Sequence, residues 1–286
     1  MRLPFTHAIG LLLCTVLTFA AAHAADEPVL QLQLDNQKQK LALSNLLRHP
    51  STQTITIPND PTYKRSMTYQ AIPLSAILRD IRGFEALQFK ATDGFVATIP
   101  VSLLRSASEP WLALEPQTRP WPAVAPGKPS AGAFYLVWLM PEKSGVSPEQ
   151  WPFQIESIAD VEPLEKRYPQ IVPQTQTDSA AWRGMHLFTV NCASCHRING
   201  GGDGAVGPDL NLPFNPTEYF HEDFLRRLIR DSSSVRNWPQ RMMPAFSETV
   251  LSDTQLDDLL AYLRQMAKQK AAIPPQPESP PQSPAQ

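Results

Sequence analysis

The stretch Cys192-Ala193-Ser194-Cys195-His196 decides how the rest of this sequence is interpreted. Two thiols three residues apart on a helical turn can each form a thioether to one edge of a porphyrin, and the histidine that follows is then held under the iron. Histidine supplies a neutral nitrogen ligand, and a hydrogen-bond partner on its other ring nitrogen sets the tautomer. The spacing predicts one covalently bound haem c, with Cys192 and Cys195 as thioether residues and His196 as an axial ligand of the iron.

Two other kinds of site use a Cys-x-x-Cys pair, a thiol redox centre and half of a zinc site. Zinc would need two further ligands, and only His186 and His221 remain in this part of the chain. A thioredoxin-like centre would lie in a βαβ unit, whereas the flanks here have helical spacing. We therefore favour haem attachment.

The region around the motif, residues 180–270, has the pattern of an all-α domain. Residues 180–190 and 224–230 have apolar side chains at helical spacing, and Ser252 with Gln255 forms a capping box at the start of a last helix. Residues 163–179 are rich in proline and show no apolar period, which predicts a linker. The proline-rich residues 271–286 predict a disordered tail.

The preceding region, residues 26–162, predicts a mixed and strand-rich α+β domain. Strand patterns occupy residues 29–34, 54–57, 95–99 and 134–140, and residues 74–81 have helical spacing. Asp93-Gly94 is expected to form a simple hairpin turn.

The N-terminus predicts export. Met1-Arg2 is followed by an apolar run from Ala8 to Ala22, and Ala22-His23-Ala24 has the form of a cleavage site. The run is shorter than the roughly 20 residues of a membrane-spanning helix, although an uncleaved anchor is the alternative. We expect residues 1–24 to be a signal peptide and the mature protein to lie in the bacterial periplasm without a membrane span. Its removal takes Cys14 away, so no thiol remains outside the motif.

Charge excludes some partners. The chain has 25 Lys and Arg against 27 Asp and Glu, a net charge of −2. This balance gives no reason to expect nucleic acid or an anionic membrane surface as a partner.

The second axial ligand has five candidates, Met242, Met243, Met266, His186 and His221. Met243 is favoured because it precedes Pro244 in a proline-punctuated stretch before the last helix, where a loop can fold over the far face of the haem. Met242 is the reserve, and Met266, inside the last helix, is expected to fill the core. Met/His ligation leaves no open iron position and favours one-electron transfer.

Residues 180–270 resemble a class I monohaem c-type cytochrome. Gly184 and Phe188 look like the contact positions of the family's first helix, and Leu259 and Tyr262 look like their partners in the last helix. The segment Gly207-Pro208-Asp209-Leu210 is similar to the family's loop after the motif. The resemblance implies that the Pro208 carbonyl accepts a hydrogen bond from His196 and that Met243 is the distal ligand. It also implies haem propionate contacts from Arg236, Trp238 and Arg241.

Residues 29–162 resemble the molybdopterin-dependent oxidoreductases of the sulfite oxidase type. Residues 69–78 (YQAIPLSAIL) and 91–104 (ATDGFVATIPVSLL) are similar to motifs of that family, in the same order. The family binds molybdenum through a cysteine after the strand that residues 54–57 resemble, but this sequence continues as Ile57-Pro58-Asn59-Asp60. Because no thiolate is available there, we expect a degenerate domain without molybdopterin, retained as a scaffold or docking module.

These observations together predict an exported electron carrier without substrate chemistry of its own. We expect its partner to be a periplasmic redox protein, a dehydrogenase or an oxidase. One alternative is a haem-containing subunit or fusion of a sulfite-oxidase-like dehydrogenase. A haem sensor of small gases is a second alternative, and it would require Met243 to dissociate easily.

Overall fold

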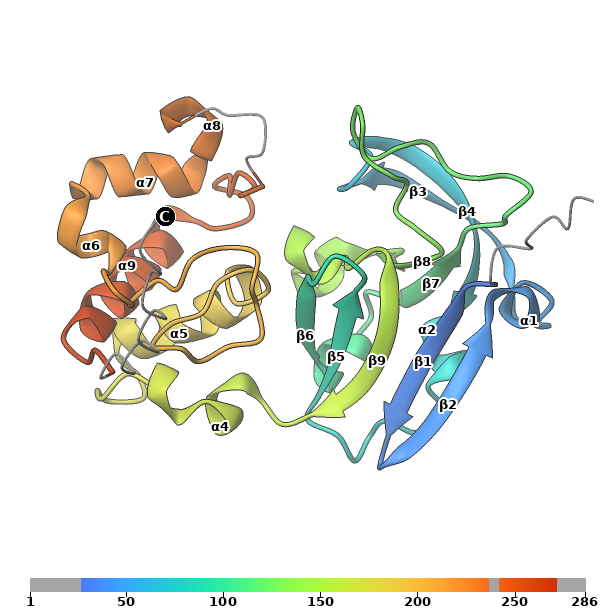
Figure 1. Cartoon of the computed structure of the whole chain (residues 1–286), viewed down its shortest axis with the longest axis horizontal. Coiled ribbons are helices and arrows are strands. Elements are labelled where there is room, and N and C mark those ends of the chain that lie inside the picture. The colour runs from blue at the N-terminus through green and yellow to red at the C-terminus, as the bar shows by residue number, and fades with distance from the viewer. Residues whose placement is uncertain (1–26, 237–241, 272–286) are drawn as a thin grey trace, which may run out of the picture.

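Two separate clusters of buried apolar side chains divide the chain in the computed structural model, which describes residues 27–236 and 242–271. The first cluster extends from Leu30 to Ile158, and the second from Leu164 to Met266. We call the two parts the strand-rich unit and the helical unit. Figure 1 shows them side by side, with the chain passing from β9 of the first to α4 of the second.

The strand-rich unit is built on two sheets. One has five strands in the order β2-β1-β9-β5-β6, with β1 and β9 parallel, and the other has four antiparallel strands in the order β3-β4-β7-β8. The strands are β1 (Val29–Leu34), β2 (Gln37–Ala42), β3 (Gln53–Asp60), β4 (Arg65–Pro73), β5 (Ala86–Ala91), β6 (Val96–Pro100), β7 (Pro110–Leu114), β8 (Phe134–Trp138) and β9 (Ile155–Val161). Short helices join them: α1 (Leu43–Leu47), α2 (Leu74–Ile77), α3 (Val101–Leu104), η1 (Pro141–Ser144) and η2 (Pro148–Gln150).

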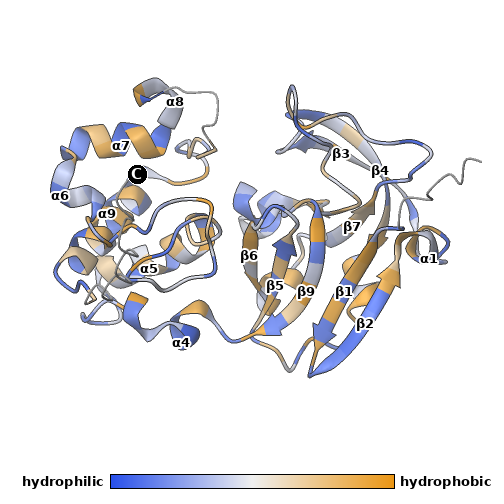
Figure 2. Cartoon of the chain, viewed as in Figure 1, coloured by the Kyte–Doolittle hydropathy of each residue, from blue (hydrophilic) through white to orange (hydrophobic). Residues whose placement is uncertain are grey.

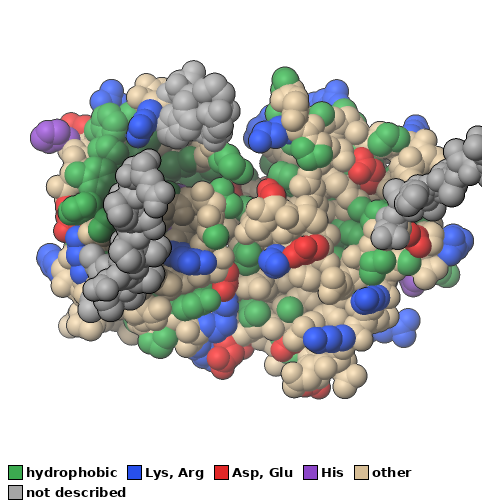
Figure 3. Space-filling view, viewed as in Figure 1, with side chains coloured by type: hydrophobic (Ala, Val, Ile, Leu, Met, Phe, Trp, Pro, Cys, Tyr) green, Lys and Arg blue, Asp and Glu red, His purple; other side chains and the backbone are tan. Residues whose placement is uncertain are grey.

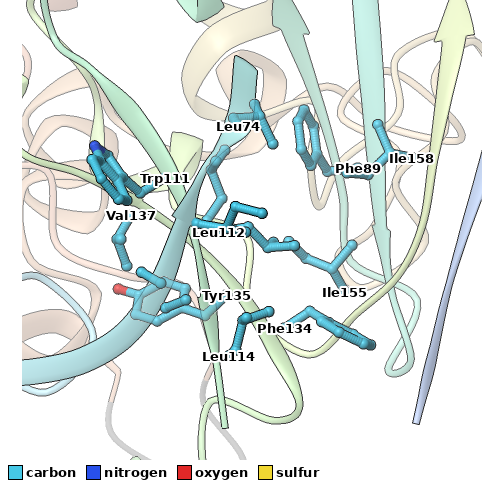
Figure 4. Close-up of a cluster of buried hydrophobic side chains, with 14 of the residues drawn as sticks. Leu74, Phe89, Trp111, Leu112, Leu114, Phe134, Tyr135, Val137, Ile155 and Ile158 are labelled. Carbon is cyan, nitrogen blue, oxygen red and sulfur yellow. The ribbon is translucent and has the colours of Figure 1, made fainter. Parts of the chain in front are cut away.

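The core of this unit lies between the two sheets. Leu30 and Leu32 of β1 are buried while Gln31 and Gln33 are exposed, so the period-two pattern points one face inward. All five residues of β8 are buried, which explains its continuous apolar sequence. The apolar bands follow the strands in Figure 2. Figure 4 shows side chains of β7 and β8 meeting those of β5 and β9.

Most of the local patterns of this unit form the elements predicted from them. Residues 29–34, 54–57, 95–99 and 134–140 lie on or overlap β1, β3, β6 and β8. At the predicted turn, Gly94 has φ +91° and the Phe95 amide donates to Asp93 Oδ1 at 3.0 Å. Glycine reaches this left-handed region without the steric cost that other residues incur.

The helix expected over residues 74–81 is shorter than its pattern. It ends as α2 at Ile77, because Leu78 adopts φ −99° and ψ 78°. Leu74, Leu78 and Ile81 are nevertheless buried. The apolar spacing therefore identified the buried side chains correctly but overestimated the helix.

The helical unit surrounds the second cluster. Its elements are α4 (Leu164–Arg167), η3 (Pro169–Ile171), α5 (Ala180–Asn191), α6 (Pro216–Tyr219), α7 (Glu222–Arg230), α8 (Ser232–Val235) and α9 (Asp253–Ala267). The predicted capping box is present at α9, where the Ser252 side chain accepts from the Gln255 amide and the Gln255 side chain accepts from the Ser252 amide. The two longest helices, α5 and α9, pack against each other.

The segment expected as a linker, residues 163–179, contains α4 and η3. Leu164 and Ile171 are buried in the second cluster, and Tyr168 packs against it. The Tyr262 hydroxyl of α9 donates to the Ile171 carbonyl at 2.8 Å. Leu164, Tyr168 and Ile171 follow helical spacing, which Pro169 obscured in the sequence. This segment contributes to the core of the helical unit.

Several sequence predictions fall outside the described residues: the signal peptide at 1–24, the side chains of Trp238 and Arg241, and the tail from residue 272 onward. Within residues 27–236 and 242–271, no helix combines the length and apolar character needed to cross a membrane.

The crossing of α5 and α9 leads to a first prediction. A Cβ on Gly184 would lie 2.0 Å from the Asp258 carbonyl oxygen and 2.7 Å from Tyr262 Cβ, so even alanine forces the helices apart. We expect Gly184→Ala to lower the free energy of unfolding by about 3 kcal/mol, as overpacking against backbone does. Urea unfolding followed by circular dichroism measures this. Gly83→Ala, whose Cβ would meet nothing within 4 Å, is the control, and equal effects of the two substitutions would contradict the role of Gly184.

Candidate functional site

The Cys-Ala-Ser-Cys-His motif begins where α5 ends. Asn191 is the last residue of α5 and Cys192 is its C-cap. The amides of Cys195 and His196 both donate to the Cys192 carbonyl, at 3.0 and 2.8 Å, so the motif forms one tight turn. Both thiols are free of disulfide bonds and half-buried. This turn presents both thiols and the following imidazole from one short segment.

The imidazole of His196 has a partner on one nitrogen. Its Nδ1 lies 2.8 Å from the carbonyl oxygen of Pro208, which is the contact that the resemblance implied. A proton on Nδ1 donates to this carbonyl and leaves Nε2 as the nitrogen that can bind a metal. Burial lowers the pKa of His196, which favours the neutral form that ligation requires.

The loop that carries Pro208 fits closely around the imidazole. A Cβ on Gly207 would lie 2.3 Å from His196 Cε1 and 2.6 Å from Nδ1. The Gly207 amide donates to the Cys195 carbonyl at 2.9 Å, so the loop also hydrogen-bonds to the motif. A residue without a side chain is therefore required at this position.

Three buried asparagines, which belong to none of the motifs described above, hold this loop in place. Asn211 Nδ2 donates to Asn199 Oδ1 at 2.6 Å and to the Met266 carbonyl at 2.8 Å. Asn215 Nδ2 donates to the Leu263 carbonyl at 3.0 Å. Both carbonyls belong to α9, so these amides tie the loop after His196 to the last helix. The signal was present in the sequence as three asparagines within a glycine-rich segment, but their partners are distant in the chain.

The five candidates for a second ligand have different environments. Met266 is fully buried in the core, as expected, while Met242, His186 and His221 are exposed. His221 is the N-cap residue of α7, and the His186 ring lies against Trp182. Met243 is half-buried at the edge of the second cluster, and its carbonyl accepts from Ser232 Oγ at 2.8 Å. Of the five, Met243 has the environment that best suits a ligand.

Apolar side chains on the surface of the helical unit extend this site. Leu210, Phe220 and Leu228 are half-buried against the second cluster, and Phe214 is 66% exposed. Figure 3 shows hydrophobic side chains gathered over α6 and α7 and continuing into a recess facing the strand-rich unit. Free thiols, a neutral imidazole and uncovered apolar surface are together the donor set and lining that fit a haem.

Of the three predicted propionate contacts, Arg236 is the one that lies within the described residues. Arg236 is exposed and follows α8, with its amide donating to the Ser232 carbonyl at 3.0 Å. The alternative zinc site has no counterpart within the described ranges, where no group of three or more His, Cys, Asp or Glu side chains could hold a metal ion.

The strand-rich unit reaches the motif, which the sequence did not predict. Glu149 of η2 accepts a hydrogen bond from Ser194 Oγ at 3.5 Å, and the Ser147 hydroxyl donates to Asn191 Oδ1 at 2.8 Å. Burial raises the pKa of Glu149 to about 7. No local pattern marks Glu149, because its environment comes from residues that are distant in sequence.

Asp203 makes a second connection between the units. Its carboxylate pairs with both terminal nitrogens of Arg167, at 2.8 and 2.6 Å, and accepts from the Tyr168 hydroxyl at 2.7 Å. Gln88 of β5 donates to the same carboxylate at 2.9 Å. The loop after His196 is thereby fixed to α4 and to the strand-rich unit.

The contact between Gly207 and the imidazole leads to a second prediction. We expect Gly207→Ala to displace the imidazole from Pro208, because the new methyl group would overlap it. The measurement is the fraction of purified chain that carries covalent haem, together with the visible spectrum of that fraction. We expect a severalfold lower fraction or a changed axial-ligand spectrum. Gly83→Ala serves again as the control, and a Gly207→Ala protein with an unchanged haem content and spectrum would show that the close fit is unimportant.

Comparison with known proteins agrees with this geometry for one part of the chain. The family model described as Cytochrome c matches residues 181–267, close to the range predicted from the sequence. A search of curated proteins finds no match to the chain. This match does not identify the strand-rich unit as sulfite oxidase-like. The helical unit contains a cytochrome c domain, a family that implies covalently bound haem c and a haem-based electron carrier.

Proposed function

We propose that the protein is an exported electron carrier that exchanges single electrons through one haem c, attached at Cys192 and Cys195. The bound haem supplies a one-electron couple. The observation that carries the proposal is the imidazole of His196, held by Pro208 directly after the turn with the two thiols. This arrangement supplies two points of attachment and one oriented ligand within a five-residue segment.

The second ligand in this proposal is Met243. Its half-buried position and the hydrogen bond from Ser232 to its backbone support the assignment. A haem held by both His196 and Met243 would have no open coordination position, and thioether ligation with burial would raise its reduction potential. Both effects favour electron transfer over oxygen chemistry. Arg236, Trp238 and Arg241 are proposed as contacts for the propionates.

We propose that the strand-rich unit is a scaffold that docks a periplasmic redox partner, a dehydrogenase or an oxidase. The buried carboxylate of Asp60 supports a structural role at the position where the sulfite oxidase resemblance would lead to a metal ligand. Asp60 Oδ1 accepts from the amides of Thr62 and Tyr63, both at 2.9 Å, and Oδ2 accepts from the Tyr69 hydroxyl at 2.7 Å. Tyr135 donates to Oδ1 as well, at 3.2 Å. Stoichiometric molybdenum in the purified protein would favour the alternative, a sulfite-oxidase-like dehydrogenase.

Adjacent methionines make the ligand assignment testable. We expect Met243→Ala to abolish the methionine–iron charge-transfer band of the oxidised protein and to lower its reduction potential, because the thioether ligand is lost. The optical spectrum and a redox titration of the haem-loaded protein measure these effects. Met242→Ala, which removes a side chain that is 60% exposed, is the matched control and should leave both unchanged. If the band survives in Met243→Ala and disappears in Met242→Ala, the ligand is Met242.

A further inference from the structure

We propose that Glu149, a residue of the strand-rich unit, binds a proton when the protein accepts an electron, so that this unit makes the reduction potential depend on pH. The inference rests on the proposed function, since it assumes haem attachment at Cys192 and Cys195. It assigns the strand-rich unit a role in electron transfer beyond docking.

Contacts between the two units fix the position of the Glu149 carboxylate. Glu149 lies in η2, where Ser147 and Gln150 form a reciprocal capping box. Ser147 also donates to Asn191 Oδ1 at 2.8 Å, so η2 is fixed against the end of α5. Glu149 Oε2 then lies 3.5 Å from Ser194 Oγ, one residue before Cys195. The carboxylate is therefore held at the haem-attachment segment by contacts between the units.

The Glu149 carboxylate lies beside a small cavity between the two units. Apolar and polar side chains from both units, including Val96, Thr98 and Thr189, line a cavity of about 10 Å³ beside Glu149. A cavity of this size holds about one water molecule, which could deliver a proton. Burial raises the pKa of Glu149 to about 7, although the Ser194 hydrogen bond and the Lys64 charge oppose the shift. Glu149 thus titrates near neutral pH.

The charge of Glu149 acts on Cys192 and Cys195, the two residues proposed to attach the haem. Burial and then the Glu149 carboxylate raise the pKa values of Cys192 and Cys195. In the haem-loaded protein both sulfurs are thioethers and no longer titrate, so the same field acts on the bound group. A site largely removed from solvent makes this interaction stronger than it would be in water.

Other charged groups around Glu149 have separate roles. Asp203, which also lines the cavity, is paired with Arg167, Tyr168 and Gln88. Asp93 raises the pKa of Cys195 from the β5–β6 turn, and Lys64 acts on Glu149 from the β3–β4 turn. His196 is kept neutral by burial. Among these groups, Glu149 is the carboxylate poised to exchange a proton.

Uptake of a proton by Glu149 would compensate the charge of the electron that enters the protein. Ionised Glu149 stabilises the oxidised protein, which carries one more positive charge at the haem. When one electron enters from the donor, the carboxylate loses this stabilisation, its pKa rises, and it takes up at most one proton from the solvent. The reduction potential is constant at low pH, where Glu149 is protonated in both states. It falls as pH rises between the two pKa values, by up to tenfold in the redox equilibrium per pH unit, which is 59 mV for one electron. Above both values it is constant again, at a lower level.

The experiment is a redox titration of the full-length, haem-loaded protein between pH 5 and pH 9. We expect the wild type to show this fall in potential near neutral pH. Glu149→Gln should match the wild type at pH 5 and exceed it at pH 9, by up to tenfold in the redox equilibrium. Glu142→Gln is the control, because Glu142 is an exposed carboxylate of η1 in the same unit. It should follow the wild type throughout.

Two further measurements keep the proposal falsifiable. Ser194→Ala removes the hydrogen bond that lowers the pKa of Glu149, so the interval of pH dependence should move to higher pH even if Glu149→Gln folds poorly. Reduction at pH 7 in weak buffer should take up a measurable fraction of a proton in the wild type and less in Glu149→Gln. A wild type without pH dependence, or a slope retained in Glu149→Gln, would overturn the proposal. The absence of any reversible one-electron couple would instead contradict the proposed function.

Discussion

The close crossing of α5 and α9 at Gly184 is the constraint on which the haem site depends. Because Gly184 has no side chain, the Asp258 carbonyl of α9 can approach the backbone of α5 directly. This crossing fixes the end of α5, where Cys192 begins the motif, relative to α9. The carbonyls of Leu263 and Met266 on α9 accept hydrogen bonds from Asn215 and Asn211. These bonds position the loop that contains Pro208, whose carbonyl lies against His196. The imidazole of His196 is thus oriented by a helix that is distant in sequence, because asparagine side chains in the loop donate to the carbonyls of that helix.

Contacts between the units give the strand-rich unit a direct connection to this site. Asp203, which follows the motif, is held by Arg167 at the end of α4, by Tyr168 directly after it, and by Gln88 from β5. A partly buried carboxylate with several charged or polar donors keeps a defined position, since moving it would leave those donors unpaired. Ser147 and Glu149 add contacts at the end of α5 and at Ser194. The environment of the motif therefore comes from two units that have separate hydrophobic cores.

The sequence predicted the features that local residues determine. The motif, the capping box at Ser252 and the alternating strand at residues 29–34 need only neighbouring residues, and each is present in the structure. Residues 163–179 were predicted as a linker because they are rich in proline and show no apolar period, yet Leu164 and Ile171 are buried in the helical unit. The helix expected over 74–81 ends after one turn, since its apolar side chains reach the core without a continuous helix. Asn211 and Glu149 could not be identified, because burial by distant residues gives each its role.

Asp60, which is buried, and Glu149, which is half-buried, differ in the number of hydrogen bonds that their carboxylates accept. Asp60 accepts from two amides and two tyrosine hydroxyls, so removing its charge would leave several buried donors without a partner. Glu149 has the single long contact to Ser194 and a pKa raised to about 7 by burial. Protonation of Glu149 costs little in lost hydrogen bonds and removes a poorly solvated charge. Asp60 is therefore suited to hold the β3–β4 turn, while Glu149 is suited to change its charge when the charge beside it changes.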